Sequence, residues 1–116
     1  MIGVYIIKNI KNGFSYIGSS KMIESRITEH FWNLGYNTHY NYRMQRDYLI
    51  DYRYFVWGIY KEFDSDTDYW KVYETEQLLL DTIHDKYNIL LGARDHLHYK
   101  RDNNKITKTR QLKFKF

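Results

Sequence analysis

The chain contains no cysteine, which excludes disulfide bonds and zinc sites built from thiolates. No apolar run approaches the roughly 20 residues that a membrane-spanning helix requires. The N-terminal residues lack the basic segment and the following apolar stretch of a secretory signal peptide. These absences predict an intracellular, soluble protein that makes no contact with a membrane.

Proline is also absent, whereas tyrosine is in excess: aromatic residues make up 19% of the chain, which has 13 tyrosines. A tyrosine side chain combines apolar area with a polar tip, so a tyrosine-rich surface suits an amphipathic or anionic partner. An AT-rich genome, which favours Tyr, Asn, Lys and Ile, explains the excess equally well. Together with the small size, this bias suits a phage, viral or mobile-element protein acting in a host cell.

Positive charge is concentrated near the C-terminus. The net charge is +4, but seven basic residues and one acid lie between Tyr99 and Phe116, so residues 1–98 are net acidic. Such a basic segment suits contacts with phosphates, and a solubilising end is the alternative. The length allows one catalytic-size domain, expected over residues 1–92, with a basic C-terminal extension over 93–116 as a DNA-contacting arm. The DNA-contacting candidates are Lys100, Arg101, Lys105, Lys108 and Arg110.

The first part of the chain predicts a β-hairpin followed by a helix. Residues 2–8 and 14–18 are β-branched and aromatic, and an Asn-Gly turn separates them. A helix is expected over 21–34, with Ser19 or Ser20 as its N-cap. Its apolar positions recur at helical spacing and are Ile23, Ile27, Phe31 and Leu34.

The remainder predicts a shorter helix over 40–50, a strand over 53–63 and the longest helix over 68–86. The strand is apolar enough to lie centrally in a sheet, and residues 87–91 are expected to lead away from the core. The element order predicts an α+β fold, in which helices flank a small three-stranded antiparallel sheet and a basic C-terminal tail follows.

One carboxylate interrupts the apolar face of the last helix. At 100° per residue, Glu76 lies at the centre of that face, whereas Glu74 points to the opposite side. The apolar members of the face are Tyr69, Val72, Tyr73, Leu79, Leu80 and Ile83. A buried carboxylate is costly unless it is paired, protonated or bound to a metal. A structural ion pair is the alternative to a functional carboxylate, which we favour.

Four further side chains complete a candidate site. Arg26 and His30 are i, i+4 neighbours beside the apolar stripe of the first helix, and Tyr5 and Tyr16 alternate with apolar strand residues. Hydrolysis of a phosphodiester needs such groups: a metal ligand, a proton acceptor, and cations for the developing charge. No histidine pair has a convincing zinc spacing; the only loose pair is His96 with His98, so a hard ion such as Mg²⁺ suits the carboxylate better.

These residues resemble the GIY-YIG nuclease family, in particular the catalytic domain of phage intron-type homing endonucleases. The triplets "GVY" at 3–5 and "YIG" at 16–18 resemble the two motifs that give the family its name, with valine at the isoleucine position of the first. Several more residues follow in the family's order across residues 1–92. They are Arg26, His30, His39, Glu76 in "ETEQLLL" and Asn88 in "YNI".

The resemblance implies a role for each of these residues. Tyr5 would accept the proton of the attacking water with help from His30, and Lys8 would lower the pKa of the phenol. Arg26 would stabilise the pentavalent phosphate, and Glu76 would hold one divalent metal ion, Mg²⁺ or Mn²⁺. The remaining implied site residues are Tyr16, Gly18, His39 and Asn88, of which Asn88 would brace the site.

The implied function is metal-dependent endonuclease cleavage of DNA, most simply double-stranded, by a homing-like or degradative enzyme of low sequence specificity. A dimer on DNA would be one source of specificity. Two alternatives stay open. One is a catalytically inactive nucleic-acid-binding domain, which would have no need of a buried carboxylate. The other is a restriction-type endonuclease, for which the expected recognition insertions are not evident.

Overall fold

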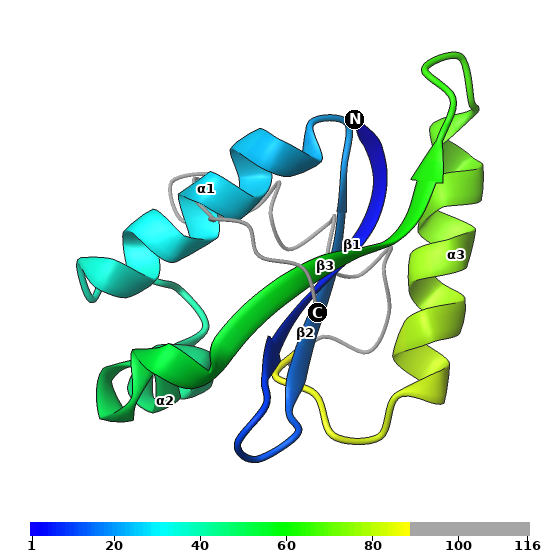
Figure 1. Cartoon of the computed structure of the whole chain (residues 1–116). Coiled ribbons are helices and arrows are strands. Elements are labelled where there is room, and N and C mark those ends of the chain that lie inside the picture. The colour runs from blue at the N-terminus through cyan, green and yellow to red at the C-terminus, as the bar shows by residue number, and fades with distance from the viewer. Residues whose placement is uncertain (89–116) are drawn as a thin grey trace.

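The computed structural model describes residues 1–88, so the predicted DNA-contacting segment lies outside the described residues. A three-stranded antiparallel sheet with strand order β2-β1-β3 forms its centre. Helices α1 and α2 cover one face and α3 covers the other (Figure 1). The predicted α+β fold is therefore confirmed. The elements are β1 (Ile2–Asn9), β2 (Ser15–Ser20), α1 (Ile23–Gly35), α2 (Tyr42–Ile50), a 3-10 turn (Tyr52–Tyr54), β3 (Phe55–Phe63) and α3 (Tyr69–Thr82).

The central strand is β1, and the expectation that the third strand lies centrally is wrong. Strand β3 is an edge strand that pairs with β1 alone. Its large apolar residues are instead explained by packing, because Phe55 and Trp57 are almost fully buried beneath α1 and α2. The apolar composition of β3 therefore reflects its burial and not a central position in the sheet.

A bulge in β3 changes which face its side chains reach. Val4 pairs with Lys61 but Tyr5 pairs with Ile59, so Tyr60 is the extra residue. A bulge shifts the alternation of side chains by one residue. As a result Ile59 packs with the α1 side of the core, whereas Phe63 packs with the α3 side.

The glycine of the first motif lies against the backbone of β3. A Cβ atom on Gly3 would lie 2.1 Å from the backbone carbonyl oxygen of Lys61. No side chain fits in that space unless the strands separate, which explains why glycine occupies the position. The turn of the β1–β2 hairpin also uses glycine, because Gly13 has a φ of +81°.

The predicted start of α1 and the predicted end of α3 differ from the structure. Helix α1 begins at Ile23 without a side-chain cap, and Ser20 accepts a hydrogen bond from Met22 N instead. The N-cap prediction is therefore wrong, since neither serine caps the helix. At the other end of the domain, α3 ends at Thr82, four residues before the predicted end.

Residues after α3 return to the sheet. The Ser15 N–H donates to the Asp85 carbonyl, and the Tyr87 N–H donates to the Ser15 carbonyl, at 3.1 and 2.7 Å. Tyr87 is 1% exposed and stacks on Phe55. The expectation that residues 87–91 lead away from the core is therefore wrong for Tyr87. Within residues 1–88, no helix is long and apolar enough to cross a membrane.

Candidate active site

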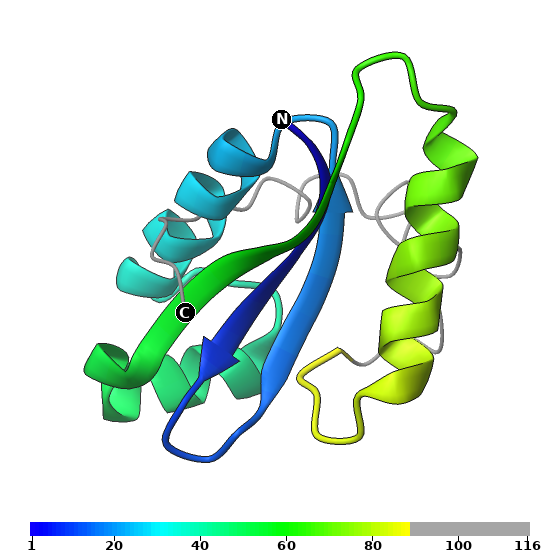
Figure 2. The same cartoon turned by 45° about the vertical axis from the view of Figure 1, so that its right-hand side comes forward.

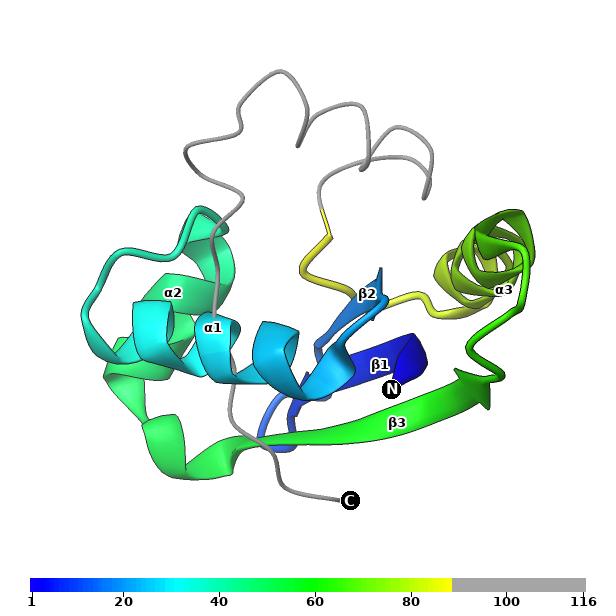
Figure 3. The same ribbon diagram turned by 90° about the horizontal axis from the view of Figure 1, so that it is seen from above.

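The candidate residues meet at the β2 edge of the sheet, between α1 and α3. Figures 2 and 3 show β2 lying between these two helices. Four elements supply these side chains: Tyr5 comes from β1, Tyr16 from β2, Arg26 and His30 from α1, and Glu76 from α3. Residues that are 71 positions apart in the sequence thus belong to one cluster.

Tyr5 is at the centre of the cluster. Its side chain is fully buried, and its hydroxyl lies 2.9 Å from His30 Nε2. Burial raises the pKa of Tyr5 well above its usual value, while the charge of Arg26 and a hydrogen bond from it lower that pKa. The protein at rest therefore holds Tyr5 as a neutral phenol with two neighbouring groups that can stabilise its anion.

Tyr16 and the two histidines extend the cluster towards α2. The Tyr16 hydroxyl is hydrogen-bonded to that of Tyr40, and His30 Nδ1 lies 2.6 Å from His39 Nε2. Burial, and then the neighbouring Tyr40, raise the pKa of Tyr16 well above its usual value. Burial and the charge of Arg26 lower the pKa of His39 to about 3. His39 is therefore uncharged at neutral pH.

Arg26 is the cation of the cluster. Its side chain is 14% exposed and lies 3.6 Å from the carboxylate of Glu29. Burial lowers the pKa of Arg26, but its interactions with the tyrosines, Tyr5 first, outweigh this effect and raise the pKa overall. The guanidinium thus stays charged next to the phenol of Tyr5, where it can also meet an anionic substrate.

Glu76 is 1% exposed on the sheet-facing side of α3, as the helical periodicity predicts, while Glu74 is exposed. The Ser19 hydroxyl donates to Glu76 Oε1 at 2.5 Å. Among residues 1–88, no group of three or more histidine and acidic side chains is gathered around one point. The donor set therefore fits a hard ion that takes one carboxylate from the protein and fills its remaining positions with water and phosphate oxygens.

Asn88 fastens the end of the described chain to β2. Its side-chain oxygen accepts from Ile17 N at 2.9 Å and its nitrogen donates to Ile17 O at 2.8 Å. The amide thus satisfies both backbone groups of an edge-strand residue that lies between Tyr16 and Gly18.

Lys8 lies away from Tyr5, so the role implied for it is wrong. It lines a depression with Ile6 and Ile83, on the face of the sheet that carries α3. Tyr5 belongs to the core on the other face. Residues three apart on a strand point to opposite faces, and the cation that lowers the pKa of Tyr5 is Arg26.

Gly18 makes room for the phenol. A Cβ atom at this position would lie 2.3 Å from the Tyr5 hydroxyl oxygen and 2.5 Å from its Cζ. Because the Tyr5 ring is fully buried, it has no free space into which to move. The ring of Tyr5 in the first motif therefore explains why the second motif has glycine at position 18.

We expect the free energy of unfolding of the Gly18→Ala variant to be about 1–3 kcal/mol lower than that of the wild type, a typical cost of overpacking. Urea denaturation would measure the difference. Gly35→Ala is a suitable control, because a Cβ atom there would have no neighbour within 4 Å. Equal stability of the two variants would contradict the close contact between Gly18 and Tyr5.

Sequence reasoning missed four residues of the cluster: Ser19, Tyr40, Asn41 and Gln45. Asn41 had a usable signal, because an asparagine just before a helix is a typical N-cap, and its side chain does accept from Met44 N. Ser19 and Tyr40 had none, since their partners lie on distant segments, and no local pattern indicates the bonds of Gln45 to His39 and Leu34.

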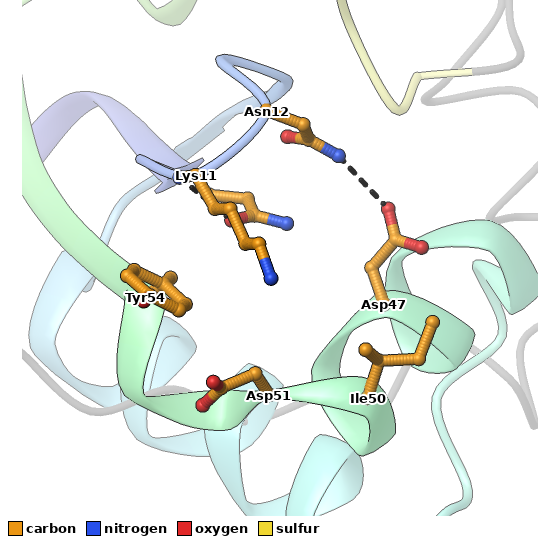
Figure 4. Close-up of a pocket in the computed structure, with 7 residues that line it drawn as sticks. Lys11, Asn12, Asp47, Ile50, Asp51 and Tyr54 are labelled. Carbon is orange, nitrogen blue, oxygen red and sulfur yellow. Dashed lines mark hydrogen bonds between the residues drawn. The ribbon is translucent and has the colours of Figure 1, made fainter.

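A separate pocket lies between the hairpin turn and the end of α2 (Figure 4). Its polar groups bind one another: Asn12 donates to Asp47 at 3.2 Å, and the Lys11 ammonium lies 5.4 Å from the centre of the Tyr54 ring. None of the predicted site residues lines it. We therefore assign this pocket to packing between the hairpin and α2.

The fold and the cluster together are those of a nuclease domain, and comparison with known proteins identifies the family. The sequence pattern of the GIY-YIG catalytic domain matches residues 1–88. The chain therefore belongs to the GIY-YIG family and is an endonuclease of that family. The resemblance inferred from the two motifs is confirmed.

Two solved structures are similar to this chain. The catalytic domain of the homing endonuclease I-TevI is 28% identical, with a TM-score of 0.69, and the match covers 78% of this chain and 99% of that domain. A glutamate-to-alanine variant of the I-TevI catalytic domain is 27% identical, with a TM-score of 0.68. That match covers 77% of this chain and 93% of the variant. No curated protein sequence matches significantly.

Proposed function

We propose that the protein hydrolyses phosphodiester bonds of DNA, with Tyr5 as the proton acceptor and Glu76 as the protein's ligand to one divalent metal ion. The observation that carries this proposal is the convergence of a phenol, a guanidinium and a buried carboxylate at one sheet edge. The similarity to a homing endonuclease catalytic domain supports DNA as the substrate.

Tyr5 would take the proton of the attacking water. A phenol is a weak base unless its anion is stabilised, and hydrogen bonds to the anion lower its pKa. Arg26 supplies such a bond, and the His30 ring lies within hydrogen-bonding distance of the same oxygen. These two neighbours offset part of the cost that burial imposes on the phenolate.

Arg26 would act a second time, on the phosphate itself. Negative charge builds up on the phosphoryl oxygens as the water attacks. A fixed guanidinium therefore stabilises the transition state more than the ground state. Glu29 lies beside Arg26 and limits its movement. We expect Arg26→Ala to lower turnover by about 10²–10³-fold, the usual cost of losing one such donor.

Glu76 would bind Mg²⁺ or Mn²⁺, both of which prefer oxygen ligands. When bound, the ion supplies Lewis-acid stabilisation of the phosphate oxygens and orients the leaving group. The hydrogen bond from Ser19 to Oε1 would hold this carboxylate in place for the ion. One carboxylate supports a single-metal site and not a two-metal pair.

The test is incubation of the purified protein with supercoiled plasmid, with Mg²⁺ and separately with a chelator. We expect nicked or linear product with Mg²⁺ alone, and at least a hundredfold less from an Arg26→Ala preparation purified in parallel, which excludes a contaminating nuclease. Binding to the plasmid without cleavage would favour a silent DNA-binding domain and overturn the proposal.

We assign non-specific DNA contacts to the basic extension, which lies outside the described residues. Each phosphate that a basic residue neutralises steepens the fall of affinity with salt by roughly 0.9 in a log–log plot. Deleting residues 100–116 removes seven basic residues and should weaken binding and flatten this slope by several units. Binding titrations over a range of salt concentrations would test this, and an unchanged slope would contradict the assignment.

Sequence specificity is expected to be low, because the GIY-YIG catalytic domain accounts for the whole of residues 1–88. A homing-like or degradative role follows most simply from that arrangement. Cleavage of plasmids of unrelated sequence at comparable rates would support low specificity.

A further inference from the structure

A directed chain of hydrogen bonds ends on Tyr5, and it begins at a backbone amide. The Asn41 N–H donates to His39 Nδ1 at 3.0 Å. A backbone N–H can only donate, so His39 Nδ1 must accept and carries no proton. Since His39 is uncharged at neutral pH, its single ring proton is on Nε2.

The second link runs between the two imidazoles. His39 Nε2 lies 2.6 Å from His30 Nδ1, and the planes of the two rings are inclined by 22°. Because His39 Nε2 carries a proton, it is the donor and His30 Nδ1 is the acceptor. The proton of a neutral His30 is therefore on Nε2, which faces the Tyr5 hydroxyl at 2.9 Å.

The first donor of the chain is held firmly in place. Asn41 is 1% exposed, and its side chain accepts from Met44 N at 3.0 Å and donates to the Tyr87 carbonyl at 2.7 Å. The Asn41 peptide is thus anchored both to the start of α2 and to the segment that returns to β2. It cannot turn away to let His39 adopt the other tautomer.

The backbone of His39 is held as well, from within α2. Gln45 accepts from His39 N and donates to the Leu34 carbonyl, both at 2.9 Å. The side chain of Gln45 therefore links the His39 backbone to Leu34 at the end of α1. Both His39 and Gln45 are 6% exposed, so water does not replace these bonds.

We propose that His39 is a positioning residue that fixes the tautomer of His30, so that His30 donates its Nε2–H to Tyr5 and does not accept a proton. The inference rests on the proposed function for its catalytic meaning. With this tautomer, His30 assists Tyr5 as a hydrogen-bond donor and not as a base. The ring is a hydrogen-bond donor to the phenol oxygen, acting beside Arg26, and it favours the phenolate over the phenol.

The tautomers can be measured without DNA or metal. In ¹⁵N-labelled protein, long-range ¹⁵N–¹H correlation spectra distinguish the protonated from the unprotonated ring nitrogen of each histidine. At neutral pH we expect both His30 and His39 to carry their proton on Nε2 alone. A proton on Nδ1 of either ring would overturn the proposal. His39→Gln and His84→Gln spectra provide assignments, and the 99% exposed His84 serves as the reference for a ring in contact with solvent.

Kinetics of two His39 variants separate positioning from a merely structural role. His39→Leu removes the donor to His30, and we expect kcat to fall about 10- to 100-fold, as for groups that orient metal-bound imidazoles. KM should stay unchanged, because His39 is buried. In His39→Gln the side-chain amide can donate to His30 Nδ1, so most of the lost kcat should return.

Equal losses in His39→Leu and His39→Gln, with both proteins folded, would show that His39 acts only through packing and would overturn the proposal. His84→Gln should keep the wild-type rate. The outcomes are separable from the proposed function: wild-type protein that cuts no DNA would refute the nuclease assignment, and the NMR spectra would still decide the tautomers.

Discussion

Replacing Glu76 by glutamine should abolish metal-dependent cleavage of DNA while leaving the domain folded. Glutamine has the same shape and can still accept the hydrogen bond from Ser19, which lies 2.5 Å from Oε1. It lacks the negative charge of the carboxylate that we propose as the ligand of a divalent ion. Loss of a metal that contributes several kcal/mol corresponds to about 10³-fold or more in turnover.

The matched control for this variant is Glu74→Gln, which removes the same charge from the same helix at an exposed position. It should cleave plasmid at the wild-type rate. Calorimetric titration with Mn²⁺ should show binding to the wild type and to Glu74→Gln but not to Glu76→Gln. Because burying a charged carboxylate carries a desolvation cost that a neutral amide avoids, we expect the thermal midpoint of Glu76→Gln to be no lower than that of the wild type. Cleavage by Glu76→Gln within a few-fold of the wild-type rate would contradict the metal assignment.

The burial of Glu76 could be predicted because it depends on one helix alone. The period of 3.6 residues places it among Val72, Leu79 and Leu80, and the structure buries all four. The same holds for the apolar stripe of α1 and for the hairpin with its Asn-Gly turn. In each case the pattern lies within a short segment, where periodicity and turn chemistry act directly.

The errors arise where distant segments decide the outcome. Ser19 could serve as a helix cap by its local sequence, but in the structure its hydroxyl binds Glu76, 57 residues away. Tyr87 follows a helix and a turn, and contacts with distant residues place it in the core, among them its stacking on Phe55 and its hydrogen bond to Ser15. Neither contact has a signature in the neighbouring sequence.

The error for Lys8 is of a different kind, because the alternation of side chains along a strand already predicts the face on which Lys8 lies. Positions 5 and 8 of a strand face opposite sides, and the structure places Lys8 with Ile83 on the α3 face. The family resemblance brought the residue into the site, and the geometry of the strand removes it. The contact between His30 and His39, by contrast, depends on the loop between α1 and α2, whose path no local pattern specifies.

The Tyr5→Phe substitution should lower turnover by about 10²–10⁴-fold, the usual contribution of a positioned proton acceptor. The ring would still fill the space beside Gly18, so the fold should persist, with a loss of about 1 kcal/mol for the missing hydrogen bonds. Tyr60→Phe is the control, because Tyr60 is 52% exposed on β3 and the same oxygen is removed. It should retain wild-type cleavage.

The pH dependence of turnover gives a second, independent readout of Tyr5. A base acts only when it is deprotonated, and burial raises the pKa of Tyr5 above its usual value. At neutral pH the deprotonated fraction therefore increases about tenfold per pH unit, and kcat of the wild type should rise with it. In Tyr5→Phe the residual rate should lose this dependence. If the variant instead cleaved DNA at a rate near that of the wild type, Tyr5 could not be the proton acceptor, and Arg26 and His30 would have to act on a group other than its phenol.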